Sequence, residues 1–506
     1  MHYNLPYKKN LTYCSISSSS NERSLISQHG LFFKQKFRLL SRLFSSLPIL
    51  LTRFPIIFLP FSCNSQALSV ETMNAIQGNE PYFTYTDGQT RVEDNIDMLW
   101  ISLSDGREFT HYHNDSSYNN PIELPDFGQS FADIVMLIPA DADSIPISTL
   151  VAPPYNYWGD DDGDGDVTAT GNINLSIIDI NGVPVKRNEV LDICKAPYRM
   201  TLSTSDITLS TRYGVPNELH YPPGKVSYYI SPKAMPKVCF AKPNLKHGSD
   251  VEYRDYYFAG PASIWNIYRG FIPQSANASS YHLNFPTTGA NGLYFDLNIK
   301  ASKSFLSLLS SLSWDPVVSS NGDIKAITKP DSSGTSVRVL LEGPAAKESQ
   351  MSVLEPGNIH RPSLPQVFEV VGRDSSGKAI TKYGFELKQW FVNAARTLNH
   401  FKYYQEQISW CRSIGYRMPE IKDLTNAIRG DKSGATPASP GNYYQRRIGA
   451  GFFTEWGSVA EYTDAGFRVG HSWVRGEKGD NVDQETGGIY WWDSHNTISA
   501  GICVSP

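Results

Sequence analysis

The middle of the chain, residues 82–371, alternates hydrophobic and polar residues in short runs separated by Gly, Pro, Asn and Asp. Ile173, Leu175 and Ile177 fall on one face of an extended segment, and Asn181-Gly182 then offers a tight turn. A period of two with frequent turn residues is typical of β-sandwich domains. This part of the chain is therefore predicted to be mostly β.

Helical spacing occurs only late in the chain. Tyr404, Ile408 and Cys411 share one face of a predicted helix. A second helix is predicted from Pro419, because proline suits the first helical position and Glu420 suits the positive helix end. Its predicted apolar stripe consists of Ile421, Leu424 and Ile428.

Length and composition limit the class of protein. At roughly 150 residues per domain, 506 residues predict about three domains. A hydrophobic fraction of 40% with 12% aromatic residues is enough for packed cores. The formal net charge is −5 with 19% charged residues, so no strongly basic field is available to hold nucleic acid.

The first 67 residues differ from the rest in composition. Lysines and arginines precede an apolar run at residues 43–61, and Ser65-Gln66-Ala67 places small residues at alternate positions. This order predicts a secretory signal with a long basic lead-in, and an over-extended translation start is the alternative for its first part. Arg53 and three prolines disfavour a membrane span. A lipid-bearing Cys63 is a further alternative.

Removal of the signal would leave four of the six cysteines. In an exported chain they predict two disulfides, and separation along the chain favours Cys194–Cys239 and Cys411–Cys503 among three connectivities. Buried free thiols are the alternative. No CxxC pair occurs, so neither a zinc knuckle nor a thioredoxin-type site is indicated.

An acidic loop at residues 160–166 matches the first half of a calcium loop. Alternate aspartates in a tight turn direct carboxylates at one cation, and Gly165 allows the turn. Gly171 stands where a closing glutamate belongs, so another segment or a backbone carbonyl would complete the shell. Structural calcium is the hypothesis, and a solvated acidic turn is the alternative. The candidate ligands are Asp160, Asp162, Asp164 and Asp166.

Other chemistry is weakly indicated. His111, His113 and Asp115 would share one side of a strand and could form a metal triad, although exposed polar residues explain them as well. The Gly-x-Ser-x-Gly, His-Glu-x-x-His and phosphate-loop motifs are absent from the sequence. We therefore predict no enzymatic activity, with a surface hydrolase as the remote alternative.

Aromatic residues crowd the segment 452–492. Some must build the core, and the surplus is expected at the surface, where Trp and Tyr bind proteins or stack on sugar rings. Trp491 and Trp492 must point opposite ways on a strand, so one of them is the better surface candidate. The candidate binding residues are Trp456, Trp473, Trp491, Trp492, Arg446 and Arg447.

Several long strings from residue 131 to the C-terminus resemble the adhesion-domain proteins of the invasin and intimin group, which are large enterobacterial surface proteins. The strings lie at 157–164, 191–199, 284–292, 384–392, 409–411, 415–419 and 446–453. The last part of the chain also resembles the C-type-lectin-like domain that closes invasin and intimin. In that fold Cys411–Cys503 would be the long-loop disulfide.

The resemblance implies a function and also marks departures from the lectins. The sequence lacks the Glu-Pro-Asn or Gln-Pro-Asp tripeptide through which sugar-binding lectins of that fold hold calcium, and it lacks their inner cysteine pair. The expected function is therefore noncovalent adhesion to a protein on a host or neighbouring cell through the C-terminal domain. A glycan-binding lectin is the alternative.

The expected fold is mainly β, with immunoglobulin-like and β-sandwich domains followed by a C-type-lectin-like α+β domain. The expected location is the cell surface or outer membrane of a Gram-negative bacterium, or its exterior after secretion, with a role in virulence and no membrane span in the mature chain. The predicted regions are a signal at 1–67, an extended segment at 68–118, a sandwich at 119–300, an immunoglobulin-like domain at 301–377 and the lectin-like domain at 378–506.

Overall fold

The computed structural model describes residues 78–161, 163, 165–249, 256–318 and 322–505. The chain divides into two compact units, Met1–Thr72 and Met73–Pro506, and all described residues belong to the second. The predicted signal sequence and the alternative at Cys63 lie outside the described residues. Within the described part of the chain, no helix is both long and apolar enough to cross a membrane.

The described chain is mainly β, as predicted, and its first core lies in residues 83–230. A five-stranded sheet has the order β4-β12-β9-β8-β5, in which β4 runs parallel to β12 and the other pairs are antiparallel. Ile173, Leu175 and Ile177 of β8 are buried, which confirms the predicted period of two. The bounds are β4 Ile122–Phe127, β5 Ser144–Pro146, β8 Asn172–Ile178, β9 Tyr198–Thr204 and β12 Lys225–Lys233.

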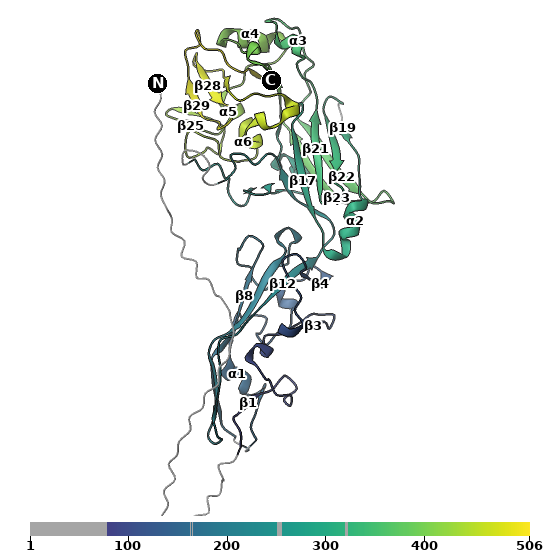
Figure 1. Ribbon diagram of the computed structural model, residues 1–506. Helices are drawn as coiled ribbons and strands as arrows, with labels where there is room; N and C mark the ends of the chain where they lie inside the picture. Colours follow the sequence, from purple (N-terminus) through teal and green to yellow (C-terminus); the bar gives the residue numbers. More distant parts are fainter. Residues whose placement is uncertain (1–77, 162, 164, 250–255, 319–321, 506) are drawn as a thin grey trace, which may run out of the picture. The chain divides into compact units, whose positions relative to one another are not determined.

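Smaller elements surround this sheet (Figure 1). They are a three-stranded sheet of β7 (Val167–Thr170), β10 (Ile207–Thr211) and β11 (Glu218–Tyr221), the pair β1 (Tyr82–Phe83) and β6 (Trp158–Gly159), the pair β2 (Ile101–Ser102) and β3 (Glu108–Phe109), and α1 (Ile147–Val151). The prediction that His111 and His113 lie in a strand is wrong. Residues His111–His113 form the short 3-10 helix η2, in which alternate residues do not share one side.

A seven-stranded sheet with the order β14-β15-β13-β17-β21-β20-β19 begins the second core. Strand β17 (Tyr294–Lys300) pairs with β13 on one side and β21 on the other, so this sheet continues across residue 300. The other bounds are β13 Lys237–Lys242, β14 Trp265–Asn266, β15 Gly270–Phe271, β19 Val317–Val318, β20 Lys325–Pro330 and β21 Ser336–Glu342.

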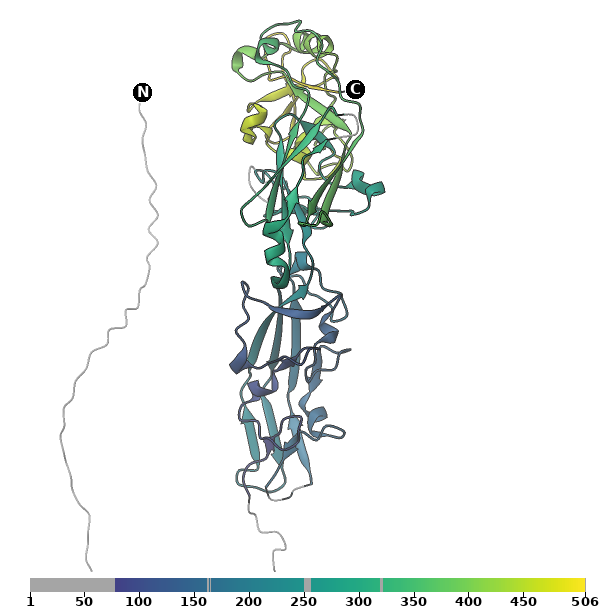
Figure 2. The same cartoon turned by 90° about the vertical axis from the view of Figure 1, so that its right-hand side faces the viewer.

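A second layer of strands faces this sheet and forms a sandwich. It consists of β18 (Ser313–Trp314), β22 (Gln366–Arg373) and β23 (Ala379–Leu387), joined as antiparallel pairs. The ring of Phe385 lies 5.7 Å from that of Phe295 in β17 and 4.9 Å from that of Phe368 in β22. All three rings are buried, and their packing is the dispersion-rich core that fastens the two sheets together. Figure 2 shows these strands in teal and green from the side.

The last part of the chain begins and ends on neighbouring strands. Strand β24 (Gln389–Asn393) pairs with β16 (Thr288–Ala290) in parallel and with β30 (Ile502–Val504) in antiparallel orientation. Helix α4 (Tyr404–Ser413) follows β24, and the sheet β27-β28-β29 lies between the helix and β30 in sequence. Its bounds are β27 His471–Trp473, β28 Asp480–Asp483 and β29 Ile489–Trp491. This arrangement agrees with the expected lectin-like α+β domain.

The first predicted helix of this domain is confirmed as α4, and the second is shorter than predicted. Helix α5 (Ile421–Leu424) is a single turn, because Thr425 has an extended backbone with φ −147° and ψ 160°. Ile428 therefore lies in the strand pair β25 (Ile428–Arg429) and β26 (Lys432–Ser433) instead of continuing an apolar stripe. The remaining elements are α2 (Leu306–Ser311), α3 (Glu348–Met351), α6 (Phe452–Trp456), η1 (Asn95–Met98), η3 (Phe131–Asp133), η4 (Ile193–Lys195), η5 (Ala278–Leu283), η6 (Lys303–Phe305), η7 (Leu398–His400), η8 (Val459–Glu461) and η9 (Thr463–Ala465).

Both predicted disulfides are confirmed. Cys194–Cys239 joins η4 to β13 across 45 residues of sequence, and Cys411–Cys503 joins α4 to β30 across 92 residues. Each disulfide closes a long loop, and closing such loops restrains the unfolded chain.

Glu455 in α6 is a fully buried carboxylate that ties the C-terminal domain to β16. Its two oxygens accept five donors: the N–H and hydroxyl groups of Thr287 and Thr288, and the N–H of Gly449, at 2.6–3.1 Å. Burial raises the pKa of the Glu455 carboxyl, and the hydrogen bonds act in the opposite direction.

We expect Glu455→Gln to lower the free energy of unfolding by about 2 to 4 kcal/mol, because the new NH2 group cannot accept from the buried N–H donors. The measurement is urea unfolding of the oxidised chain. Glu461→Gln is the matched control, since Glu461 is a partly exposed glutamate paired with Lys246, and should cost less than about 1 kcal/mol. Equal losses for the two variants would contradict the assigned role of Glu455.

Candidate binding surface

Three of the six side chains proposed for ligand binding are core residues. Trp456, Trp473 and Arg446 each have a relative exposure of 0%. The indole N–H of Trp456 donates to the carbonyl of Thr288 at 2.9 Å, and that of Trp473 donates to the carbonyl of Lys402 at 3.0 Å. These two tryptophans therefore serve packing, and their placement corrects the expectation that they reach the surface.

Arg446 is a buried cation whose donors are used within the protein. Its guanidinium donates to four backbone carbonyls and lies 4.8 Å from the ring centroid of Trp265 and 5.4 Å from that of Tyr444. The four carbonyls belong to Asn244, Lys246, His247 and Glu455. A guanidinium has five N–H donors in a planar array, against three on a lysine ammonium, and can therefore bind four carbonyls at once. Arg446 thus joins residues 244–247 to the C-terminal domain and does not border a surface patch.

Trp491, the last residue of β29, and the following Trp492 differ in exposure. Trp491 is 57% exposed, and its indole N–H donates to the carbonyl of Lys478 at 3.0 Å, which fixes the ring. Trp492 is half-buried and packs against the core. Arg447 is also half-buried. Trp491 is therefore the exposed anchor among the six candidates.

His471 forms an aromatic cluster beside Trp492. The centroid of its ring lies 4.0 Å from that of Trp492 and 5.2 Å from that of Tyr490, and its Nδ1 lies 2.8 Å from the side-chain oxygen of Asn481. Burial lowers the pKa of His471 below 6.5, while Asp483 and Asn481 act to raise it. The neutral ring is the form that this cluster favours.

Three loops next to this cluster expose aliphatic side chains. Leu398 is 63% exposed, Val469 60% and Ile498 43%. The loops are adjacent, because Lys402 and Ser499 exchange both backbone hydrogen bonds and the Ser499 hydroxyl donates to the carbonyl of His471. We call Leu398, Phe401, Val469 and Ile498 the apolar patch. Exposed apolar side chains on neighbouring segments, beside the half-buried Phe401, make this region a candidate interaction surface.

Arg468 borders the apolar patch with an exposed guanidinium. No ion pair of Arg468 occurs among the residues that the structure describes. An exposed cation next to apolar side chains favours a partner that carries negative charge around an apolar centre.

The sequence analysis did not predict the apolar patch. Its residues come from three loops separated by up to about a hundred positions, and single apolar residues in loops create no period of two or 3.6. Most of the aromatic rings crowded into residues 452–492 are in the core.

The acidic loop lies only in part within the described residues. Asp160 and Asp166 are described, whereas Asp162 and Asp164 are not. Asp161 accepts a hydrogen bond from the side chain of Asn79 at 3.0 Å. No group of His, Cys, Asp and Glu able to hold a metal occurs in the described part, so structural calcium stays a prediction.

The metal triad proposed for His111, His113 and Asp115 is not assembled, because the two histidine rings do not face a common metal position. His111 Nδ1 lies 3.2 Å from the carboxylate of Asp97, whereas His113 Nδ1 lies 3.3 Å from the hydroxyl of Thr110. The two rings therefore have different partners.

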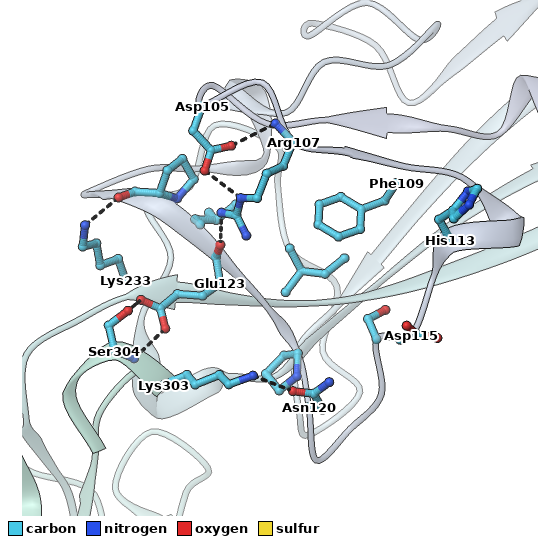
Figure 3. A pocket seen from close by; sticks show the side chains of 15 residues that line it. Asp105, Arg107, Phe109, His113, Asp115, Asn120, Glu123, Lys233, Lys303 and Ser304 are labelled. Carbon is cyan, nitrogen blue, oxygen red and sulfur yellow. Dashed lines mark hydrogen bonds and ion pairs between the residues drawn. The ribbon is translucent and has the colours of Figure 1, made fainter. Parts of the chain in front are cut away.

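A polar cleft of about 670 Å³ lies near Asp115 (Figure 3). Its charged groups are bound by the protein itself: Arg107 pairs with Asp105 at 2.7 Å, and Glu123 accepts from the N–H and hydroxyl of Ser304. Lys303 donates to the side chain of Asn120 at 3.1 Å. Arg107, Glu123 and Lys303 in this cleft are thus held by neighbouring residues of the protein.

No known protein family and no curated protein matches this chain. Solved structures do match. A mutant of intimin from EHEC O157:H7 is 14% identical with a TM-score of 0.24, and the match covers 48% of this chain and 93% of that one. A C-terminal 282-residue fragment of intimin, in complex with the intimin-binding domain of translocated intimin receptor, is 10% identical with a TM-score of 0.27 and coverages of 67% and 94%.

A third structure, the intimin–Tir90 complex, is 12% identical with a TM-score of 0.23 and coverages of 53% and 99%. These matching proteins belong to the group that the sequence resembles.

We expect the free energy of unfolding to fall as the pH drops below about 6.5, because the lowered pKa of His471 lets the unfolded chain bind a proton that the folded chain does not. The stability that neutral His471 contributes is fully present above about pH 6.5. It is lost as the pH falls from there to the lowered pKa of His471 in the folded protein. His471→Gln should reduce the pH dependence in urea unfolding at pH 8 and pH 5. His495→Gln, at an exposed histidine, should leave it unchanged, and identical profiles for His471→Gln and the parent would contradict the assignment.

Proposed function

We propose that this protein is an exported adhesin that binds a protein on a host or neighbouring cell noncovalently through its C-terminal domain. The observation that carries the proposal is the apolar patch, in which Leu398 and Val469 expose about three fifths of their surface. Burial of such side chains by a partner would contribute the main binding energy. The exposed cation of Arg468 supplies charge complementarity and a faster encounter with an acidic rim.

The proposed export has its own support. Two disulfides are formed among the described residues, and disulfides persist in oxidising environments outside the cytosol. We propose the bacterial surface or its exterior as the place of action, in agreement with the predicted signal sequence.

Glycan binding is the second candidate, and Trp491 favours it. Its indole N–H is occupied by the carbonyl of Lys478, while 57% of the side chain remains exposed. A ring held in this way offers a face on which a sugar can stack. The two candidates use different side chains and can be separated by mutation.

We expect Leu398→Asp and Val469→Asp to weaken binding of the oxidised chain to epithelial cells at least about tenfold, because a charge would be buried against an apolar partner surface. Saturation binding by flow cytometry measures the effect. Val190→Asp is the matched control, since Val190 is 61% exposed outside the C-terminal domain, and it should bind as the parent does. Unchanged binding of both patch variants would refute the proposed surface.

Trp491→Ala tests the glycan candidate. If the protein ligand is bound at the apolar patch, this variant should keep cell binding within about threefold of the parent, because energetically neutral contacts surround a hot spot. A glycan array probed with the parent should then give no hits. Array hits that disappear in Trp491→Ala would instead support the lectin.

A further inference from the structure

The two disulfides differ in their access to solvent. Cys411 and Cys503 have an exposure of 0%, and so does Gln407, whose side-chain amide donates to both sulfurs at 3.1 and 3.5 Å. The Cys411–Cys503 bond is therefore enclosed by the core of the C-terminal domain. A thiol in solution could reach it only after this core opens.

Cys194–Cys239 lies instead in the wall of a cleft of about 910 Å³. Cys239 in β13 is 2% exposed, while Cys194 in η4 is partly exposed. Tyr268, which also lines the cleft, is 76% exposed. Both cysteines line the cleft, and Cys194 is the more exposed residue of the two, so we take its sulfur as the point of approach.

We propose that Cys194–Cys239 is a thiol-exchange site, at which a small external thiol opens the disulfide while the protein stays folded. The inference goes beyond adhesion and does not depend on it. The external thiolate attacks Sγ of Cys194, the bond between the two cysteine sulfurs breaks, and Cys239 leaves as a thiolate that takes up a proton. A second external thiol then releases Cys194 as a thiol and leaves as the oxidised external disulfide, so two electrons come from two thiols.

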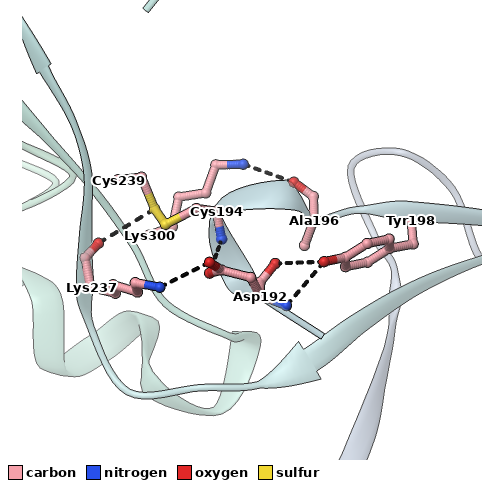
Figure 4. Close-up of a disulfide and its surroundings, with 7 residues drawn as sticks. All are labelled: Asp192, Cys194, Ala196, Tyr198, Lys237, Cys239 and Lys300. Atoms are coloured by element: carbon pink, nitrogen blue, oxygen red, sulfur yellow. Dashed lines mark hydrogen bonds and ion pairs between the residues drawn. A yellow bond between two sulfur atoms is a disulfide. The ribbon is translucent and has the colours of Figure 1, made fainter. Parts of the chain in front are cut away.

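Charged side chains of both signs lie near the disulfide (Figure 4). Lys237 pairs with Asp192 at 2.9 Å, and the Lys300 ammonium donates to the carbonyl of Ala196 at 2.7 Å. Burial lowers the pKa of Lys300 to about 8, so it is still mainly cationic at neutral pH. The carboxylate of Asp192 also accepts a hydrogen bond from the N–H of Cys194 at 3.0 Å, so the proposal depends on access to the disulfide and not on the local charge.

Opening this bond would have a local effect. The disulfide is a covalent connection between the core of residues 83–230 and the core of residues 238–504. Noncovalent contacts between these parts remain, including Ser304 with Glu123. The expected product is a folded protein with a loosened connection between its two cores.

The test uses the oxidised chain under native conditions at pH 8, with reduced glutathione as the probe. Samples are quenched at intervals with an alkylating reagent and the cysteines are quantified by peptide mass spectrometry. Because access controls exchange, labelling of Cys194 and Cys239 should be at least about tenfold faster than labelling of Cys411 and Cys503. In denaturant the two rates should become similar.

A Cys411→Ala/Cys503→Ala variant separates local access from global unfolding. If the site reacts in the folded state, the exchange rate at Cys194–Cys239 should stay within about twofold of the parent although the variant is less stable. A rate that rises with the loss of stability would overturn the proposal. Equal native rates for the two disulfides of the parent, or absence of labelling before unfolding, would also overturn it.

Discussion

The structure of the C-terminal half depends on burying one carboxylate with all its partners in place. Glu455 accepts from Thr287 and Thr288 on a segment 168 and 167 positions earlier, and from Gly449 close by. An ionised group in a core is tolerated only when hydrogen bonds replace its water. The sandwich and the lectin-like domain consequently share one core, to which β16 contributes from the sandwich side. Arg446 adds a second, cationic connection to residues 244–247.

Local pattern was sufficient to predict much of the fold. The alternation at Ile173, Leu175 and Ile177 predicted a half-buried strand because neighbouring side chains of a strand face opposite ways. The face of Tyr404 and Cys411 predicted α4 in the same manner. Both disulfide pairs were also predictable, since few connectivities exist for four cysteines.

Long-range partners were not predictable from one sequence. Arginine is a residue type that is usually exposed. Arg446 is buried because four backbone carbonyls accept hydrogen bonds from its guanidinium. Helix α5 ends after one turn, because the backbone of Thr425 is extended. The apolar spacing did not predict this end, since tertiary packing overrides local helix preference there. The apolar patch depends likewise on loops that tertiary contacts bring together. Such features arise from packing between segments, about which periodicity carries no information.

The pairing of β24 with β30 has a consequence for biosynthesis. Trp390 exchanges hydrogen bonds with Ser505, so the strand that opens the C-terminal domain is completed by residues more than a hundred positions later. While residues 502–505 are still inside the ribosome, β24 lacks this neighbour and the sulfur of Cys411 lacks its partner. The domain can therefore close only after residues 502–505 have left the ribosome, and until then its aromatic core must be kept from other chains by whatever receives the nascent polypeptide.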